Sequence, residues 1–392
     1  EKTMEQLHFT REQVSKILDS ISQKEGGIQE VLKLSLESIM RAEREIYKET
    51  YGDMSNGYRM RRTFGQGRIL ELRVPRTRQG QFYPLLLGMI KDQEEECRKM
   101  AFSLYGAGLT TAQVGEIFGE LYGKNYSTSQ ISRMFEYARE EVSRWLKRPL
   151  EPYYPIVMID ATFIYTRRQD SVSKEGYYTI LGVRADRTRE VLAIVNFPTE
   201  SACGWKEVIL SIKKRGVKEI GIVVCDSLSG VESVIWQHFS QVSIQFCTQH
   251  LERNIQKYVK PKHKEEVSAD FKQIFRAGDS SHTVEKAKQM WKEFTDKWGK
   301  HYPSIKRKSE TERMELYFTY LKYDYRVQSM LYTTNWIERL NRDYKRTTRM
   351  RGALPNPEAT ILLLGYVAMT RSAYQRKIPK LNYENKKFKW EE

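Results

Sequence analysis

The chain has 392 residues, 40% of them hydrophobic, which is enough for two or three domains with a buried core and excludes a disordered protein. Its formal net charge of +16 favours a polyanionic partner, above all nucleic acid, over a merely solubilising surface, which commonly mixes both signs. Four cysteines are too few for a disulfide framework, no apolar run reaches the ~20 residues of a membrane span and no signal-peptide core opens the chain, so we expect a cytoplasmic, nucleoid-associated protein without a membrane partner.

Residues 1–55 are predicted to form a helical region for dimerisation or packing. Ile17, Leu18 and Ile21 recur at helical spacing, and the pattern resumes after a break at Gly26 and Gly27. Nothing in this stretch points to catalysis.

Residues 56–90 form an arginine-rich segment that contains a single acid before Gly80, Glu71, and a predicted short strand from Arg68 to Val74. Arginine is favoured where planar, bidentate contacts to phosphate or guanine are needed. The segment is therefore predicted to contact DNA, and a solvated surface loop is the alternative. The candidate DNA-binding residues are Arg59, Arg61, Arg62, Arg68, Arg73, Arg76 and Arg78.

Residues 91–150 are predicted to hold three helices, the first from about Lys91 to Gly106, the second from a Thr110 cap and the third from Ser127 to about Lys147. A short turn followed by a capped helix is typical of a helix-turn-helix DNA-binding domain. Ser129, Gln130 and Arg133, at the start of the third helix, would face bases or phosphates. Small helical domains that do not bind DNA show the same pattern.

Residues 151–255 alternate between strands and helices. Two apolar strands, 155–160 and 220–226, each end in an aspartate, and a hairpin of strands 177–183 and 190–196 lies between them. With helices from about 204, 231 and 248 and a strand at 242–246, the order is βββαβαβα. That order is that of a ribonuclease H-like fold.

Asp160 and Asp226 are candidate catalytic carboxylates at the ends of those two strands. Adjacent parallel strands would bring both to one edge of the sheet, where open α/β sheets place their sites. Hard ions such as Mg²⁺ prefer oxygen ligands, and two of them activate a nucleophile and stabilise a leaving oxygen in phosphodiester chemistry. Each aspartate alone is better explained as an ordinary turn residue at a strand end, and two such strands in this order weaken that explanation.

Glu338 opens a predicted helix that runs from Asn335 to about Thr347. Asn335 and Glu338 match a capping box, in which the asparagine caps the helix and the glutamate bonds back to it. Glu338 would then close the helix end, with Arg342 one turn later as an ion-pair partner. From the residues alone this structural role is favoured over a catalytic one.

The chain resembles the mutator-type transposases of bacterial insertion sequences over most of its length. The motifs are Ala42-Glu-Arg-Glu45, Val74-Pro-Arg76, Ser129-Gln-Ile-Ser-Arg133, Pro155-Ile-Val-Met-Ile-Asp160, Val223-Val-Cys-Asp226, Cys247-Thr-Gln-His250 and Asn335-Trp-Ile-Glu-Arg-Leu-Asn-Arg342. The last three, in this order, are highly specific. The sequence departs from the family pattern at Ser227, usually glycine, at Trp336, usually small, and over 162–165, and none of these positions is a metal ligand.

The resemblance implies a multidomain α+β protein with a helical N-terminal DNA-binding region and a ribonuclease H-like core interrupted by a helical insertion. The 112 residues between Asp226 and Glu338 leave room for that insertion, whose aromatic residues are expected to pack its own small core. The implied segments are a first core part at 151–255, the insertion at 256–332, the core helix with the catalytic Glu at 333–350 and a basic helical tail at 351–392.

The resemblance also implies that Asp160, Asp226 and Glu338 hold two Mg²⁺ or Mn²⁺ ions and catalyse strand cleavage and strand transfer at the terminal inverted repeats of an insertion sequence. The partners would be double-stranded DNA, at the element ends and at the target, and a second copy of the chain in a homodimer or higher oligomer. The rivals are a nuclease of the same fold that hydrolyses without joining, and a DNA-binding protein derived from a transposase.

Two further groups accompany the carboxylates. Cys247 and His250 form a C-x₂-H pair that is half of a zinc site, but only Cys225 could complete it, so an auxiliary role next to the carboxylates is preferred to zinc, and a buried thiol and a core histidine are the structural alternative. Arg342, Lys345 and Arg346 follow Glu338 at helical spacing and are predicted to contact DNA phosphates, or else to be plain surface cations.

Overall fold

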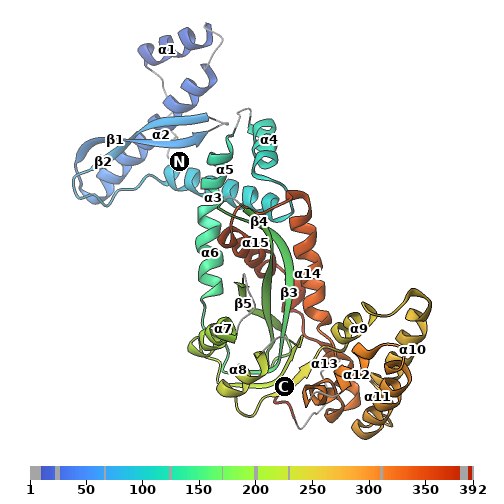
Figure 1. Cartoon of the computed structure of the whole chain (residues 1–392). Coiled ribbons are helices and arrows are strands. Elements are labelled where there is room, and N and C mark those ends of the chain that lie inside the picture. The colour runs from blue at the N-terminus through green and yellow to red at the C-terminus, as the bar shows by residue number, and fades with distance from the viewer. Residues whose placement is uncertain are drawn as a thin grey trace. The chain divides into compact units, whose positions relative to one another are not determined.

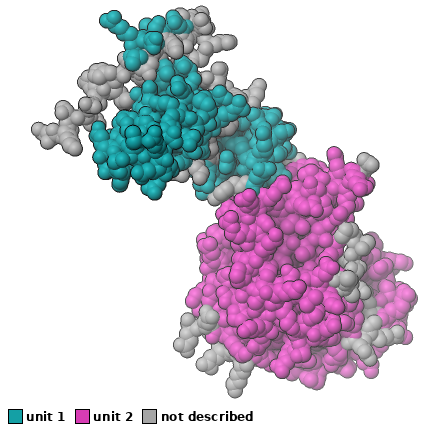
Figure 2. Space-filling view, turned by 90° about the vertical axis from the view of Figure 1, so that its left-hand side faces the viewer, with its two compact units in different colours: residues 1–138 teal, residues 139–392 magenta. Residues whose placement is uncertain are grey.

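The structure, a computed structural model, describes residues 10–22, 27–65, 68–122, 126–169, 171–197, 202–227, 230–309, 312–379 and 387–390. The chain divides into two compact units, residues 1–138 and 139–392, which Figure 2 shows in different colours. Among the described residues no helix is long and apolar enough to cross a membrane.

The first unit joins helices to a two-stranded antiparallel ribbon (Figure 1). Leu70, Leu72 and Val74 alternate along one face of the second strand and are buried with Met40 of the long helix α2, as expected for a strand with one covered face. The predicted strand before Pro75 is confirmed but runs on through the proline, and its partner strand is absent from the prediction. These elements are α1 (Arg11–Ser22), α2 (Gly27–Tyr51), β1 (Ser55–Gly65) and β2 (Arg68–Thr77).

Three helices complete this unit. The predicted Thr110 cap is confirmed, since its hydroxyl accepts from the Gln113 amide, and Ser127 and Gln130 form a reciprocal capping box. The predicted long third helix is wrong: it breaks at Phe135, whose buried ring packs against Phe102. The helices are α3 (Leu85–Gly106), α4 (Thr111–Tyr122) and α5 (Thr128–Met134), and α6 (Glu136–Leu146) spans the division between the units.

The second unit is built on a five-stranded sheet in the order β5-β4-β3-β6-β7. The first three strands along the chain are antiparallel, and the last two run parallel to β3. The predicted hairpin and the predicted order of strands and helices are confirmed. The elements are β3 (Tyr153–Arg168), β4 (Ser171–Val183), β5 (Arg189–Phe197), α7 (Ala202–Lys214), β6 (Glu219–Cys225), α8 (Val231–His238) and β7 (Ser243–Phe246).

Helices cover both faces of this sheet. The ring of Tyr178 on β4 packs against Trp205 of α7, whereas its neighbour Tyr177 faces Thr360 of α15. Since successive strand residues point to opposite faces, α7 covers one face and α15 the other. The helix α14 packs along β3 (Figure 1). The two helices are α14 (Asn335–Thr348) and α15 (Pro357–Met369).

The segment after α14 returns to β3. Gly352 has φ +64, in the left-handed region that favours glycine, and turns the chain so that Leu354 forms a bridge with Thr166. The Leu354 amide donates to the carbonyl of Tyr165 at 2.8 Å, and its carbonyl accepts from Arg167 at 2.9 Å. Strand β3 is thereby attached to the chain that follows α14.

The stretch between β7 and α14 is helical, as predicted. Phe275 stacks on Phe318, and Trp291 stacks on Phe294, all four buried, so the prediction of a small aromatic core is confirmed. The elements are α9 (Thr248–Gln256), η1 (Pro261–His263), α10 (Lys264–Ile274), α11 (Val284–Gly299), α12 (Pro303–Ser309), η2 (Glu312–Tyr317), η3 (Thr319–Lys322) and α13 (Tyr325–Leu331), and η4 (Arg349–Arg351) and η5 (Ser372–Gln375) follow α14 and α15.

Candidate active site

Asp160 and Asp226 lie level with each other on adjacent parallel strands. Ile159 pairs with Cys225, so the two aspartates follow the last register pair of β3 and β6. Asp226 stands directly after β6, as predicted. Asp160, however, is in the middle of a 16-residue strand and not at its end. The strand continues because residues 161–168 alternate between the two faces and pair with β4.

Glu338 lies in the first turn of α14, and the same helix reaches Asp160. The side-chain amide of Asn341, one turn further along, donates to Asp160 Oδ2 at 2.8 Å, and both side chains are buried. The predicted capping box is wrong: Thr334 is the N-cap, it makes no side-chain cap bond, and Asn335 is exposed inside the helix. The glutamate is therefore not used to close the helix.

The Glu338 carboxylate is held by side chains of α9. Arg253 donates to its Oε1 at 3.0 Å. With the Gln249 amide oriented so that its nitrogen faces the carboxylate, it donates to Oε1 at 2.8 Å and to Oε2 at 3.2 Å. Arg342, the partner expected from the sequence, is exposed on the next turn of α14.

The Cys247-x-x-His250 motif begins α9 and connects the three carboxylate segments. The Cys247 amide donates to the Cys225 carbonyl, next to Asp226, at 2.8 Å, and its thiol accepts from Thr334, the N-cap of the Glu338 helix, at 3.6 Å. His250 Nε2 lies 3.8 Å from Asp160 Oδ1. The motif thus ties the end of β6, the start of α14 and the middle of β3 together.

The pKa values of Asp160 and His250 are shifted by burial and by the negative charges that lie close together in this cluster. Burial raises the pKa of Asp160 to about 6; the charge of His250 opposes this rise, and the charges of Glu338 and Asp226 add to it. Burial alone would lower the pKa of His250, but its contact with Cys247 and the charges of Asp226 and Asp160 raise it to about 9. At neutral pH the histidine is a cation beside a carboxylate that is costly to ionise.

The donor chemistry of this cluster fits a divalent cation. A buried carboxylate whose ionisation is opposed by two like charges is stabilised by a hard cation with oxygen ligands. Within the described ranges, however, no three His, Cys, Asp or Glu side chains lie close enough together to hold a metal ion. Glu338, which is bound to Arg253 and Gln249, would have to release those contacts to join the aspartates.

The candidate DNA-binding residues are distributed over both units. In the first unit Arg59, Arg62, Arg73, Arg76 and Arg78 are exposed and Arg61 is half-buried, while the side chain of Arg68 lies outside the described residues. Ser129 and Arg133 are exposed on α5, but Gln130 is half-buried and its amide oxygen accepts from the Ser127 amide. In the second unit Arg342, Lys345 and Arg346 are exposed on α14. These contacts stay predictions.

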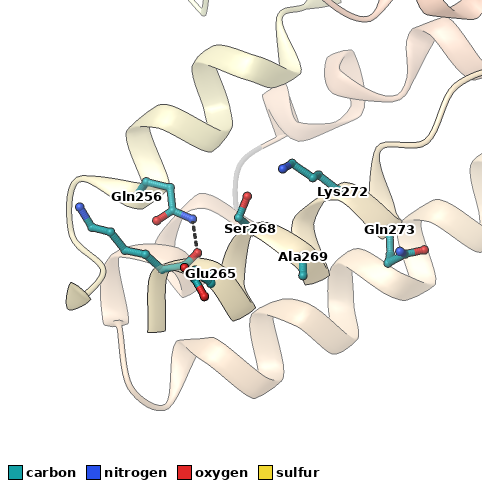
Figure 3. A pocket seen from close by; sticks show the side chains of 7 residues that line it. Gln256, Glu265, Ser268, Ala269, Lys272 and Gln273 are labelled. Carbon is teal, nitrogen blue, oxygen red and sulfur yellow. Dashed lines mark hydrogen bonds between the residues drawn. The ribbon is translucent and has the colours of Figure 1, made fainter. Parts of the chain in front are cut away.

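A hollow of about 650 Å³ lies between α9 and α10. Figure 3 shows Gln256 directed at the first turn of α10, where its amide donates to the Lys264 carbonyl at 3.0 Å. None of the three carboxylates lines it. The hollow is therefore not the candidate active site.

Sequence reasoning did not single out three residues of this site, Asn341, Gln249 and Arg253. Asn341 stands three residues after Glu338, on the same helical face, and that spacing is a usable signal. Gln249 and Arg253 meet Glu338 across 89 and 85 residues of sequence, so no local pattern could have identified them.

The comparisons with known proteins agree with the resemblance found in the sequence motifs. The profile of the family described as "Transposase, Mutator family" matches residues 3–376. The transposase for insertion sequence element IS905 of Lactococcus lactis is 29% identical over 358 residues, covering 88% of this chain and 90% of its own. The probable transposase for insertion sequence element ISRM3-like of Sinorhizobium fredii is 31% identical over 360 residues, covering 90% and 89%.

Among solved structures, a chain of the Drosophila P element transposase strand transfer complex aligns with 72% of this chain and 93% of that chain. The identity is 11% and the TM-score 0.35, too low to establish a shared fold. The family profile spans nearly the whole chain, including every motif of the carboxylate cluster. The protein belongs to the Mutator family of transposases.

Proposed function

We propose that this transposase catalyses metal-dependent strand cleavage and strand transfer at the terminal inverted repeats of an insertion sequence. The observation that carries the proposal is the bond from Asn341 to Asp160, because it fixes the helix of Glu338 against the strand of Asp160 at the level of Asp226. The relatives named as insertion sequence transposases support the substrate.

The second unit is proposed to be a ribonuclease H-like core, with residues 256–332 as its helical insertion. The element order βββαβαβα and the sheet order with two parallel strands beside a three-stranded antiparallel part support this assignment. In the first unit, α4 and the capped α5 are proposed to act as a helix-turn-helix.

Asp160, Asp226 and Glu338 are proposed to hold two Mg²⁺ or Mn²⁺ ions, which would activate the attacking oxygen and stabilise the leaving 3′ oxygen. Asn341 holds one oxygen of Asp160 and leaves the other to face His250 and the site. His250, a cation at neutral pH, stabilises the ionised form of Asp160. To join the aspartates, the Glu338 carboxylate would release its hydrogen bonds with Gln249 and Arg253. Arg253 would then be available to bind a DNA phosphate.

Double-stranded DNA, from the element ends and the target, is the proposed partner, together with a second copy of the chain to bring two ends together. The exposed arginines of β1 and β2 and the exposed cations of α14 support the DNA contact. The formal charge of +16 supplies the long-range attraction.

The test is to incubate the full chain with DNA that carries the element ends in Mg²⁺ and to follow cleaved and joined strands. We expect both products from the wild type and neither from Asp160→Asn, Asp226→Asn or Glu338→Gln, with DNA binding retained. Cleavage without joining would favour the nuclease alternative. Unchanged products from Glu338→Gln would refute the three-carboxylate mechanism, and binding without any cleavage by the wild type would favour a DNA-binding protein.

A further inference from the structure

The hairpin of β3 and β4 projects from the sheet beyond the candidate active site. The pairing between β3 and β6 ends at Ile159 and Cys225, whereas β3 and β4 stay paired as far as Arg168 and Ser171. Phe163 and Tyr165 on this projection are each 53% exposed, although the residues on either side of them are at least partly covered. Two large rings therefore face solvent a few residues after Asp160.

The strand register decides which side chains share this face. Phe163 lies opposite Gly176, Tyr165 opposite Lys174 and Arg167 opposite Val172. Arg167 and Lys174 are exposed, and Val172 is 51% exposed. We call Phe163, Tyr165, Arg167, Val172 and Lys174 the hairpin patch.

The hairpin patch is aromatic and basic, and the acidic residues of its two strands lie on the other face. Among the residues of β3 and β4, the acids are Asp160 and Glu175. By register both point to the opposite face, where Asp160 meets Asn341 and Glu175 is bound by Arg168. Among the described residues of these two strands, the charged side chains on this face are the cations Arg167 and Lys174, and an exposed apolar surface beside cations is complementary to a polyanion with flat apolar groups.

Each ring has a neighbour on the opposing strand. Phe163 lies beside Gly176, where a Cβ would come within 3.5 Å of its ring, and Lys174 Nζ stands 5.9 Å from the centroid of the Tyr165 ring. Such cross-strand pairs stabilise a hairpin, and aliphatic side chains would pack there as well. Exposed rings next to cations are the combination that binds unpaired nucleic acid, since every base has a face to stack on a ring.

Resting on the proposed function, we propose that the hairpin patch binds unpaired bases of the DNA strand that flanks the phosphate at Asp160. Phe163 and Tyr165 stack on the bases, and Arg167 and Lys174 contact the adjoining phosphates. Phe163 is three residues, about 10 Å, along the strand from Asp160. Because Asp160 points to the other face, the DNA strand has to pass around the edge of β3 between the end of its pairing with β6 at Ile159 and the Leu354 bridge at Thr166, and this bend takes its bases out of the duplex.

The proposal is tested by binding single-stranded DNA to the full chain without divalent ions. The probe is a 12-nucleotide oligomer with a fluorescent label and an internal 2-aminopurine, whose emission falls when it stacks on an aromatic ring. For the double variant Phe163→Leu, Tyr165→Leu we expect affinity to fall at least roughly fivefold and the 2-aminopurine quenching to be lost, the loss of a stacked base being worth about this much or more. Its salt dependence should stay unchanged, because no phosphate contact is removed.

Three variants serve as controls. Phe163→Trp, Tyr165→Trp restores rings and should restore quenching, and Val172→Ala should bind as the wild type does. Lys174→Ala should lower the salt dependence but keep the quenching. Equal affinity and quenching in the leucine variant would overturn the proposal, as would a dimer that dissociates only in that variant, since a second copy would then cover the patch. The assay needs no metal or catalysis, so a failure of the proposed reaction leaves its result interpretable.

Discussion

The five-stranded sheet and the β1–β2 ribbon hold their charged side chains in opposite ways. In the sheet, Glu190 is nearly buried and accepts from Arg148, Arg184 and Tyr154. On the ribbon, Arg62 and Glu71 form a pair in which the arginine is 77% exposed. A buried charge is fixed in place by bonds that folding depends on, whereas an exposed one contributes little to stability and stays available to a partner.

The largest expected effect is a loss of stability, and it tests this contrast by making the same substitution, arginine to methionine, once in each region. Arg148→Met removes a partner of buried Glu190 and should destabilise the second unit by about 3 kcal/mol. All seven tryptophans belong to that unit, so urea unfolding followed by tryptophan fluorescence reports it. Arg62→Met, followed by circular dichroism, should change stability by less than about 1 kcal/mol. Equal losses at both positions would break the comparison.

The next effect concerns a buried carboxylate that serves chemistry. Asn341→Leu leaves Asp160 Oδ2 without its donor and should slow DNA cleavage by roughly 10- to 100-fold, the usual cost of removing a group that orients a ligand. DNA affinity should not change. Asn335→Leu, on the exposed side of the same helix, is the matched control. A cleavage rate for Asn341→Leu equal to that of the control would mean that this bond does not position Asp160.

A smaller effect should appear in the pH dependence of stability. Burial would raise the pKa of Glu190, but hydrogen bonds from Arg148 and Tyr154 and the arginine charges lower it below its ordinary value of 4.5. A carboxyl whose folded pKa is depressed adds stability above its unfolded pKa, and this is lost as the pH falls through the folded value. Glu190→Gln should therefore flatten the loss of stability below pH 4.5. An acid-unfolding curve as steep as that of the wild type would exclude Glu190 as its source.

The smallest effect belongs to the ribbon. Arg73→Ala should weaken DNA binding a few-fold and reduce the slope of log affinity against log salt by about 1, without changing stability. Arg73 lies 4.9 Å over the ring of Tyr58, which keeps the guanidinium on the exposed face of the ribbon. Glu71→Gln, on the same strand, should leave affinity unchanged or raise it. An unchanged salt slope in Arg73→Ala would remove this arginine from the DNA contact.

Sequence reasoning predicted the sheet better than the ribbon, and the reason is where each strand obtains its stability. Apolar runs before Asp160 and Asp226 identify buried strands, and parallel neighbours place both aspartates at one level. Strand β1 has no such run, because its stability comes from pairing with β2. The length of β3 was underestimated, although Thr162, Ile164 and Thr166 alternate with exposed residues as a half-covered strand does.

The geometry around Glu338 could be predicted only in part. The motif identified the residue, but a local capping box suggested the wrong partner, since the N-cap is Thr334, one residue before the asparagine that the capping box requires. Its actual partners, Gln249 and Arg253, are brought by a helix that folds against it from far away in the sequence. Long-range contacts of polar side chains leave no periodic pattern.

The bridge between Leu354 and Thr166 has a mechanical consequence. Strand β3 is fastened to α14 at Asn341 and to the chain beyond that helix at Leu354, so strand and helix resist sliding past each other at two separate points. The backbones that carry Asp160 and Glu338 therefore belong to one stiff pair of elements, β3 and α14, while Asp226 follows the neighbouring strand β6. A reporter domain should therefore not be inserted in the short connection 349–356, and the exposed turn at 280–281 in the insertion is the better position, because added length there does not pull on β3 or α14.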